Sequence, residues 1–276
     1  MFKRILVRLD NFFYRVVLRN ILKLSKLGYG FIVSGAESGE NFEHIYNNRP
    51  QGVFLIGKFI DKVLLNLPSV QATRERKEEI KKILRKEISI NCSAGRQTRV
   101  LDLASGGARY LRELKVEHET GDVESLCVDR NMRCVNLGRT LAKREGVKNI
   151  KFLRADIFRL GSLKVISERI HWKPNVIIAS GLFIYFNDET VARILREIYQ
   201  SLPKGGLVIF QSYENLNSRK LMRKTSATST GEQWTLYYRK PLFWEQLLKK
   251  IGFEEIMITR DEWKMNNICS ARKMVG

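Results

Sequence analysis

The most informative part of this sequence reads Val100-Leu101-Asp102-Leu103-Ala104-Ser105-Gly106-Gly107-Ala108-Arg109-Tyr110-Leu111. It begins as an apolar run typical of a buried parallel strand, continues as five small residues, and resumes with helical spacing. A strand, a tight turn and a helix in this order put free backbone N–H groups at the carboxyl end of a sheet. Small residues also let a ligand approach the backbone closely, so we expect a nucleotide-like cofactor in this turn. Its predicted contacts here are Asp102, Ala104, Ser105, Gly106 and Gly107.

The turn lacks the glycines that would hold a phosphate. A dinucleotide fingerprint needs G-x-G-x-x-G, but Ala104 and Arg109 stand at its first and last glycine positions, which disfavours a nicotinamide oxidoreductase. The carboxylate of Asp102 would repel a phosphate and suits a cofactor that carries an ammonium group. This pattern resembles the first motif of class I S-adenosylmethionine-dependent methyltransferases. The plainer alternative is a tight turn between any strand and helix of an α/β protein.

Composition limits the class of protein and the partners to consider. The 276 residues are 44% hydrophobic and 28% charged, as in a globular protein. The net charge of +20 favours polyanions and does not choose between nucleic acid and acidic lipid head groups. Four cysteines form no C-x-x-C pair, so we expect no metal site, no disulfide framework and a reducing compartment. Charges interrupt the N-terminal apolar residues, which predicts a cytoplasmic protein without a secretory signal or a membrane span.

Residues 1–26 predict a basic amphipathic helix. Apolar residues recur at helical spacing, and seven Lys or Arg accompany the single acid Asp10. Two interpretations stay open. The helix packs on the domain, or it is an interfacial anchor on the inner face of an anionic membrane.

The residues up to the strand at 99–103 predict helices and loops. Residues 27–52 are rich in Gly, Ser and Asn and predict a loop around a short helix at 40–47, a candidate lid. Residues 54–67 are apolar enough for a buried helix. A charged helix with a narrow apolar face and a solvated basic face is expected at 75–87, followed by a linker at 89–97.

From Thr98 onward strand and helix patterns alternate, which predicts βαβ units and a parallel sheet. The strands are expected at 99–103, 125–129, 150–154, 176–179 and 207–211, and the helices at 109–115, 132–144, 188–202 and 242–250. Two last strands, 253–259 and 267–271, are joined by a short turn, which can connect only antiparallel neighbours.

The sequence therefore predicts an α/β protein with a Rossmann-like, seven-stranded, mostly parallel sheet that ends in an antiparallel C-terminal hairpin. Helices are expected on both faces of the sheet. The predicted domains are a helical N-terminal extension or lid at 1–95 and a cofactor-binding domain at 96–276.

Further candidate residues stand where the other parallel strands end, because ligands of such sheets bind across these ends. Asp129 could accept both hydrogen bonds of a ribose diol, and its alternative role is a helix N-cap. Asp156 suits the adenine amino group, and either Ile157 or Phe158 suits the ring. The predicted cofactor contacts from these ends are Asp129, Arg130, Asp156, Ile157, Ser180 and Gly181.

Four stretches, at 41–61, 101–104, 180–183 and 203–206, together resemble a bacterial family assigned as methyltransferases, some with the domain behind an α/β-hydrolase. The resemblance covers most of the chain from about residue 30 and leaves the basic helix outside. Ala104 is in keeping with the family, whereas Ala108 replaces the more usual glycine. The resemblance implies S-adenosylmethionine as cofactor and supplies no methyl acceptor.

Methyl transfer from a sulfonium is an in-line displacement that needs the acceptor atom about 3 Å from the methyl carbon. A general base is needed only for a protonated acceptor, and its candidates are Tyr185, Tyr213, Glu214 and His44. No Asn/Asp-Pro-Pro-Tyr/Phe tetrad follows the strand at 176–179, which argues against exocyclic adenine amines of nucleic acid as acceptors. No Pro-Cys pair follows it either, which argues against methylation at cytosine C5.

We therefore expect a small-molecule or lipid-like acceptor near a membrane. The rival interpretation is a non-catalytic protein that binds RNA or an anionic membrane and has a degenerate cofactor pocket. The sequence does not predict the oligomeric state.

Overall fold

The computed structural model describes residues 18–35, 38–118, 123–157, 173–214 and 236–274. The chain divides into two compact units, residues 1–74 with 217–235 and residues 75–216 with 236–276. The division falls inside one long helix, α6 (Pro68–Ser93), whereas the sequence placed a domain boundary at residue 95. That the N-terminal region acts as a lid stays a prediction.

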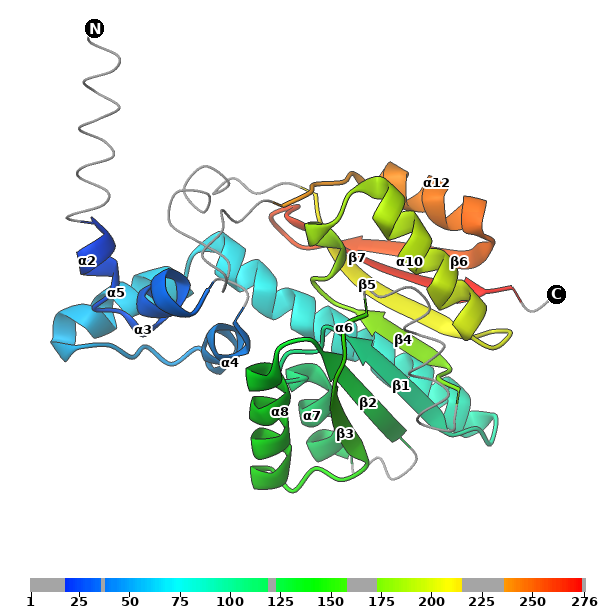
Figure 1. Ribbon diagram of the computed structural model, residues 1–276, viewed down its shortest axis with the longest axis horizontal. Coiled ribbons are helices and arrows are strands. Elements are labelled where there is room, and N and C mark those ends of the chain that lie inside the picture. Colours follow the sequence, from blue (N-terminus) through cyan, green and yellow to red (C-terminus); the bar gives the residue numbers. More distant parts are fainter. Residues whose placement is uncertain (1–17, 36–37, 119–122, 158–172, 215–235, 275–276) are drawn as a thin grey trace, which may run out of the picture. The chain divides into compact units, whose positions relative to one another are not determined.

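The second unit is built on a seven-stranded sheet with the order β3-β2-β1-β4-β5-β7-β6 (Figure 1). The parallel strands are β1 (Thr98–Leu103), β2 (Val123–Asp129), β3 (Ile150–Arg154), β4 (Val176–Ala179) and β5 (Leu207–Tyr213). The antiparallel hairpin consists of β6 (Phe253–Arg260) and β7 (Asn266–Lys273), and β7 lies between β5 and β6. The predicted fold class is confirmed. The chain reverses direction across the sheet between β1 and β4, which is the switch point where such sheets bind ligands.

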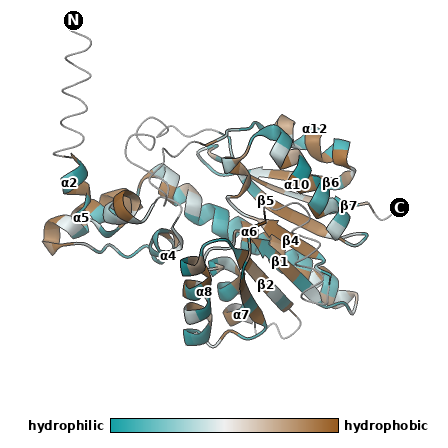
Figure 2. Cartoon of the chain, in the orientation of Figure 1, coloured by the Kyte–Doolittle hydropathy of each residue, from teal (hydrophilic) through white to brown (hydrophobic). Residues whose placement is uncertain are grey.

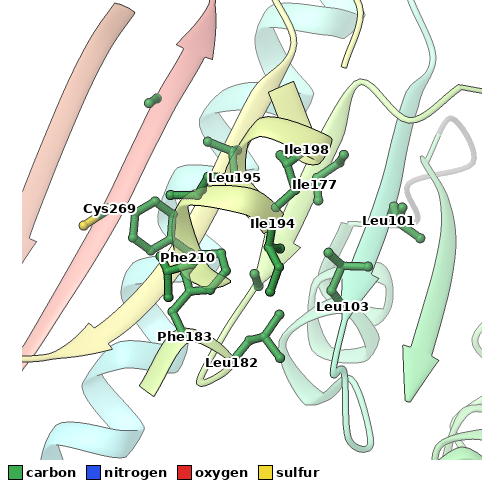
Figure 3. Packing of buried hydrophobic residues seen from close by; sticks show 14 of the residues in the cluster. Leu101, Leu103, Ile177, Leu182, Phe183, Ile194, Leu195, Ile198, Phe210 and Cys269 are labelled. Atoms are coloured by element: carbon green, nitrogen blue, oxygen red, sulfur yellow. The ribbon is translucent and has the colours of Figure 1, made fainter. Parts of the chain in front are cut away.

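Helices cover both faces of the sheet because side chains of a strand point alternately to its two sides. On one face α10 (Asp188–Ser201) and α12 (Pro241–Ile251) pack against the sheet, and Figure 3 shows Ile194 and Ile198 of α10 close to Ile177 of β4. On the other face lie α6, α7 (Arg109–His118) and α8 (Met132–Arg144). The strands β1, β4 and β5 are therefore buried along almost their whole length.

The first unit is helical. Its described elements are α2 (Arg19–Leu22), α3 (Lys26–Tyr29), a π-helical turn (Gly30–Ser34), α4 (Gly39–Asn47) and α5 (Phe54–Leu65). A small core of Leu27, Ile45, Leu65 and Val70 joins α3, α4, α5 and the start of α6. The short helix predicted at 40–47 is confirmed as α4.

The basic helix predicted at 1–26 is interrupted where the structure describes it, and residues 1–17 lie outside the described part. Ser25 adopts an extended backbone and caps α3, since its Oγ accepts a hydrogen bond from Gly28 N at 3.0 Å. The helical spacing of apolar residues thus continues across a break that a buried serine creates.

Two other expectations were wrong, and they concern neighbouring helices. The apolar segment predicted to be a buried helix forms α5, which exposes Phe54, Leu55 and Phe59. The charged helix predicted to be solvated continues to Ser93, which shortens the expected linker to residues 94–97, and it buries Arg76 and Lys81. Figure 2 shows α5 as mostly hydrophobic and much of α6 as hydrophilic. No helix in the described parts of the chain is both long and apolar enough to cross a membrane.

Candidate cofactor site

The turn between β1 and α7 holds three residues in the left-handed region of backbone conformation. The φ angles are 57° at Ala104, 55° at Gly106 and 50° at Ala108. Glycine adopts this conformation without strain, whereas an alanine pays about 1 kcal/mol. A Cβ atom added at Gly106 would meet no atom of the structure within 4 Å, so this backbone position borders open space. The turn therefore leaves room for a ligand against its backbone.

The backbone N–H groups of this turn are used within the protein. Ser105 N donates to Val128 O at 3.1 Å, Gly106 N to Asp129 Oδ2 at 3.0 Å, and Ala108 N to Ser105 O at 2.8 Å. The expectation of free N–H groups was wrong at these positions because the end of β2 lies alongside the turn. A phosphate would have to displace the Asp129 carboxylate, so the geometry disfavours a phosphate at this place.

Asp102 is the most unusual group of the site. Its side chain is fully buried near the end of β1, and neither carboxylate oxygen has a hydrogen-bond partner at ordinary distance and angle among the described residues. Burial raises the pKa of Asp102 to about 8, the Tyr110 hydroxyl acts to lower it, and the nearby Asp129 carboxylate raises it. A buried carboxyl group without donors is costly unless a ligand supplies them. An ammonium group would supply both donors and charge, so Asp102 fits the predicted cofactor.

Asp129 ends β2 and braces the turn. Its Oδ1 accepts a hydrogen bond from Asn131 N at 2.8 Å, and its Oδ2 accepts the one from Gly106. The N-cap of α8 is Asn131, whose side chain accepts from Arg133 N, so the alternative N-cap role of Asp129 is wrong. Burial raises the pKa of Asp129 and the two backbone hydrogen bonds lower it, with a net rise. A carboxylate has about four acceptor sites, so hydrogen bonds to a ribose diol stay open to it.

The other predicted cofactor contacts lie at the carboxyl ends of β2, β3 and β4. Arg130 and Asp156 are exposed, and Ile157 is buried in the hydrophobic core. Phe158 lies outside the described residues. Ser180 and Gly181 follow β4 and are half-buried. The parallel register, which pairs Asp102 with Ile178 and Asp129 with Arg154, brings these ends to one edge of the sheet. Their contact with a cofactor stays a prediction.

The four candidates for a general base come from different elements. Tyr185 lies half-buried in a short 3-10 helix after β4, and Tyr213 ends β5 and stacks on Tyr238 with ring centroids 6.3 Å apart. Glu214 pairs with Arg260 at 2.5 Å. His44 belongs to the first unit, where its Nε2 lies 2.7 Å from Asp61 Oδ2.

Glu214 and His44 would each have to share an existing partner in order to accept a proton. In the described parts of the chain, no group of three or more His, Cys, Asp or Glu could hold a metal ion.

The sequence interpretation missed a buried arginine that holds the turn. Arg112 of α7 is fully buried, its Nε donates to Gly107 O at 2.8 Å, and its Nη1 binds Glu145 Oε1 at 2.5 Å and also Oε2. This ion pair ties the turn to the end of α8. The pattern of α7 gave no signal for it, because an arginine beside Leu111 looks like any charged residue of an amphipathic helix.

A second buried arginine lies at the end of β4. Nη1 of Arg76 donates to Gln211 Oε1 at 3.1 Å, and Gln211 Nε2 donates to Asn266 Oδ1 at 2.5 Å. The same Nη1 lies 3.5 Å from the position that a Cβ of Gly181 would occupy. The sequence placed Arg76 on a solvated helix face, and only its distant partners show otherwise.

The sequence matches one family model and is similar to one curated protein. Residues 5–273 match the model of a family described as "Putative methyltransferase". The chain is 24% identical over 241 residues to the uncharacterized protein YnbC of Escherichia coli (strain K12), in a match that covers 86% of this chain and 40% of YnbC. The chain thus spans less than half the length of this curated relative.

Solved structures share the fold at low sequence identity. A protein from Bordetella parapertussis described as a possible exported protein superposes with a TM-score of 0.70 and 18% identity, covering 92% of this chain and 85% of its own. The magnesium protoporphyrin IX methyltransferase ChlM from Synechocystis PCC 6803, with bound SAH, has a TM-score of 0.55 and 12% identity, covering 85% and 94%.

The S-adenosylmethionine-dependent methyltransferase SibL in its apo form has a TM-score of 0.54 and 14% identity, covering 90% of this chain and 70% of SibL. Identities this low show the fold alone. The fold is the Rossmann-like fold of class I S-adenosylmethionine-dependent methyltransferases. The family model matches nearly the whole chain and therefore shows the family as well: the chain belongs to the family described as "Putative methyltransferase".

Proposed function

We propose that the protein binds S-adenosylmethionine and transfers its methyl group in line to an acceptor. The observation that carries this proposal is the buried Asp102 carboxyl group, whose two oxygens lack partners in the described chain, next to a turn that borders open space at Gly106. Family membership and the class I fold support it. The intact acids Asp102 and Asp129 count against the rival interpretation of a degenerate pocket.

The residues at the carboxyl ends of β1 and β2 would hold the cofactor. Asp102 would accept hydrogen bonds from the ammonium group, whose charge would lower the pKa of Asp102 and ionise it. The backbone at Gly106 would lie against the amino-acid end, and Asp129 would accept from the ribose hydroxyls while it keeps its bond to Gly106 N. When bound, the cofactor supplies an activated methyl group.

The acceptor would bind beyond the ends of β4 and β5, where the base candidates Tyr185 and Tyr213 lie. The work of these residues is to hold the acceptor atom in line with the methyl carbon and to exclude water. We propose a small-molecule or lipid-like acceptor. The net charge of +20 and the basic residues 1–26 support a place at the inner face of an anionic membrane, with RNA as the alternative partner.

Isothermal titration calorimetry at neutral pH tests the cofactor proposal. The wild-type protein should bind S-adenosylmethionine and its demethylated product but not NAD. Because Asp102 has a pKa of about 8, binding should ionise it and release a proton, so the measured enthalpy should change with the ionisation enthalpy of the buffer.

The variant Asp102→Asn should bind weakly and show no such buffer dependence. Asp156→Asn, at an exposed predicted contact, is the matched control and should keep the buffer dependence whatever its affinity. Absence of cofactor binding by the wild-type protein, or an equal proton release by Asp102→Asn, would exclude this site.

A further inference from the structure

Helix α5 turns an apolar face to solvent. The exposed fractions are 83% for Leu55, 59% for Ile56, 67% for Phe59 and 50% for Val63. Phe59 follows Leu55 by four residues and Ile56 by three, and Val63 follows Phe59 by four, so the four side chains share one side of the helix. Single exposed apolar residues are common on proteins, but a contiguous set on one helix marks an interaction surface.

Two lysines border this face. Lys58 follows Leu55 by three residues, Lys62 follows Phe59 by three, and both side chains are exposed. Residues three apart are neighbours on a helix surface, so each lysine stands beside an exposed apolar side chain. An apolar face with adjacent lysines is the pattern of a helix that lies in the surface of an anionic membrane.

The opposite side of α5 is fixed, so the helix cannot roll to bury Phe59. Asp61 Oδ1 accepts hydrogen bonds from Ser25 Oγ at 2.7 Å and from Leu27 N at 2.8 Å. Its Oδ2 accepts from Gln51 N at 2.8 Å and lies 2.7 Å from His44 Nε2.

Gly57, one turn earlier on the same side, packs so closely that a Cβ atom would come within 2.3 Å of Leu24 O. Four partners on Asp61 and the close contact at Gly57 therefore hold the apolar face outward.

We propose that this face of α5 docks the protein on an anionic lipid surface. The apolar side chains would enter the boundary between head groups and hydrocarbon, and Lys58 and Lys62 would bind the head-group phosphates. This inference deepens the membrane association proposed above and does not depend on methyl transfer.

Charge decides between a lipid surface and the other candidate occupants. In the first unit the described cations are Arg19, Lys23, Lys26, Arg49, Lys58, Lys62 and Arg74, and the described anions are Glu40, Glu43 and Asp61. Residues 1–17 add four cations and one anion. Both residues 1–17 and a second copy of the chain would therefore bring like charge to Lys58 and Lys62. A lipid surface offers hydrocarbon and opposite charge together.

Co-sedimentation of the full chain with vesicles tests the proposal. The vesicles are phosphatidylcholine mixed with phosphatidylglycerol, or phosphatidylcholine alone. The double variant Leu55→Gln/Phe59→Gln should lose about tenfold or more in affinity for the mixed vesicles. The matched control is Leu242→Gln/Met257→Gln in the second unit, where both side chains are 60% exposed, and it should bind like the wild type.

The charge variant Lys58→Gln/Lys62→Gln should weaken binding to the mixed vesicles about tenfold and leave binding to phosphatidylcholine unchanged. Its control is Lys148→Gln/Lys250→Gln, which removes two exposed lysines of the second unit. Calorimetry with S-adenosylmethionine on the same α5 variants should be unchanged. A failure of docking and a failure of cofactor binding are thus seen separately.

Three results would overturn the proposal. The first is equal vesicle binding by the α5 variants and the wild type, or no binding by any of them. The second is a lower melting temperature of Leu55→Gln/Phe59→Gln than of its control, which would mean that another segment of the chain covers this face. The third is a dimer in the absence of vesicles that these substitutions dissociate, which would assign the face to a second copy.

Discussion

In helix α5 large apolar side chains face solvent, whereas in the next helix along the chain, α6, charged side chains are buried. The buried cations of α6 have partners on other elements of the second unit. Lys77 and Lys81 bind Glu113 of α7 at 2.7 and 3.0 Å. The apolar side chains of Leu55, Ile56 and Phe59 of α5, by contrast, stay exposed to solvent. Composition therefore does not decide which of the two helices is internal.

What decides it is the set of partners that the fold brings to each helix. Burial of a charge is tolerated when a hydrogen-bonded partner of opposite sign is buried with it. Glu87 of α6 shows the same relation, since it binds Arg272 of β7 at 2.5 Å. For α5, the buried side is the one that carries Asp61, which collects donors from three other segments. One polar residue thus sets the orientation of an apolar helix.

The largest difference between the two helices should appear in a matched pair of leucines. Leu84 of α6 is fully buried in the core and Leu55 of α5 is exposed. Leu84→Ala should lower the free energy of unfolding by about 3 kcal/mol, because it leaves a cavity. Leu55→Ala should change it by about 0.5 kcal/mol or less. Urea unfolding followed by circular dichroism measures both, and equal losses would mean that the face of α5 is covered.

Glu113 should come next in size, because it neutralises the buried cations. It also binds Arg109 at 2.6 Å, and together the three cations lower its pKa to about 2, against the rise that burial alone would cause. Glu113→Gln should cost about 2.5 kcal/mol above pH 5. The folded-state pKa is depressed, so this contribution is full above the unfolded value of 4.5 and is lost as the pH falls toward 2.

The difference between wild type and Glu113→Gln in thermal melts should therefore shrink between pH 4.5 and 2. Glu124→Gln is the control, since its carboxylate lies 3.8 Å from Arg99 in an exposed pair. A constant difference across this pH range would mean that the charge of Glu113 does not carry the effect.

The dependence of burial on distant partners also explains what the sequence could and could not predict. The strands of the sheet were predictable to within about two residues, because apolar runs bounded by turns have few other interpretations. Asp102 and Asp129 could be chosen as candidates from the sequence because each stands near a strand's carboxyl end. Arg112 and Arg76 were missed because their partners, Glu145 and Gln211, lie 33 and 135 residues away. A charge at helical spacing predicts solvent unless its partner is known.

Asp129 is an intermediate case, half-buried and bound only to backbone N–H groups. Asp129→Ala should weaken S-adenosylmethionine binding by about 2 kcal/mol, roughly thirtyfold, because it removes the proposed ribose contact and frees Gly106 N. Asp188→Ala serves as the control, because Asp188 is an exposed partner of Arg239. Calorimetry should give equal affinities for the control and the wild type. An equal affinity for Asp129→Ala as well would show that the diol binds elsewhere.

Asp102 gives the sharpest contrast with α6, because it is a buried carboxyl group without a partner among the described residues. Its folded-state pKa of about 8 lies above its ordinary value of 3.8, so the folded state binds an extra proton between these values. Wild-type stability should therefore fall as the pH rises from about 4 to 8, and Asp102→Asn should lack this part of the fall. Without cofactor, the variant should be more stable than the wild type above pH 8 and nearly equal to it below pH 4. Saturating S-adenosylmethionine should reverse the order, since only the wild type gains the ammonium contact. Thermal melts with and without cofactor measure this crossing. A loss of stability in Asp102→Asn at every pH would mean that the chain itself supplies a partner to this carboxylate.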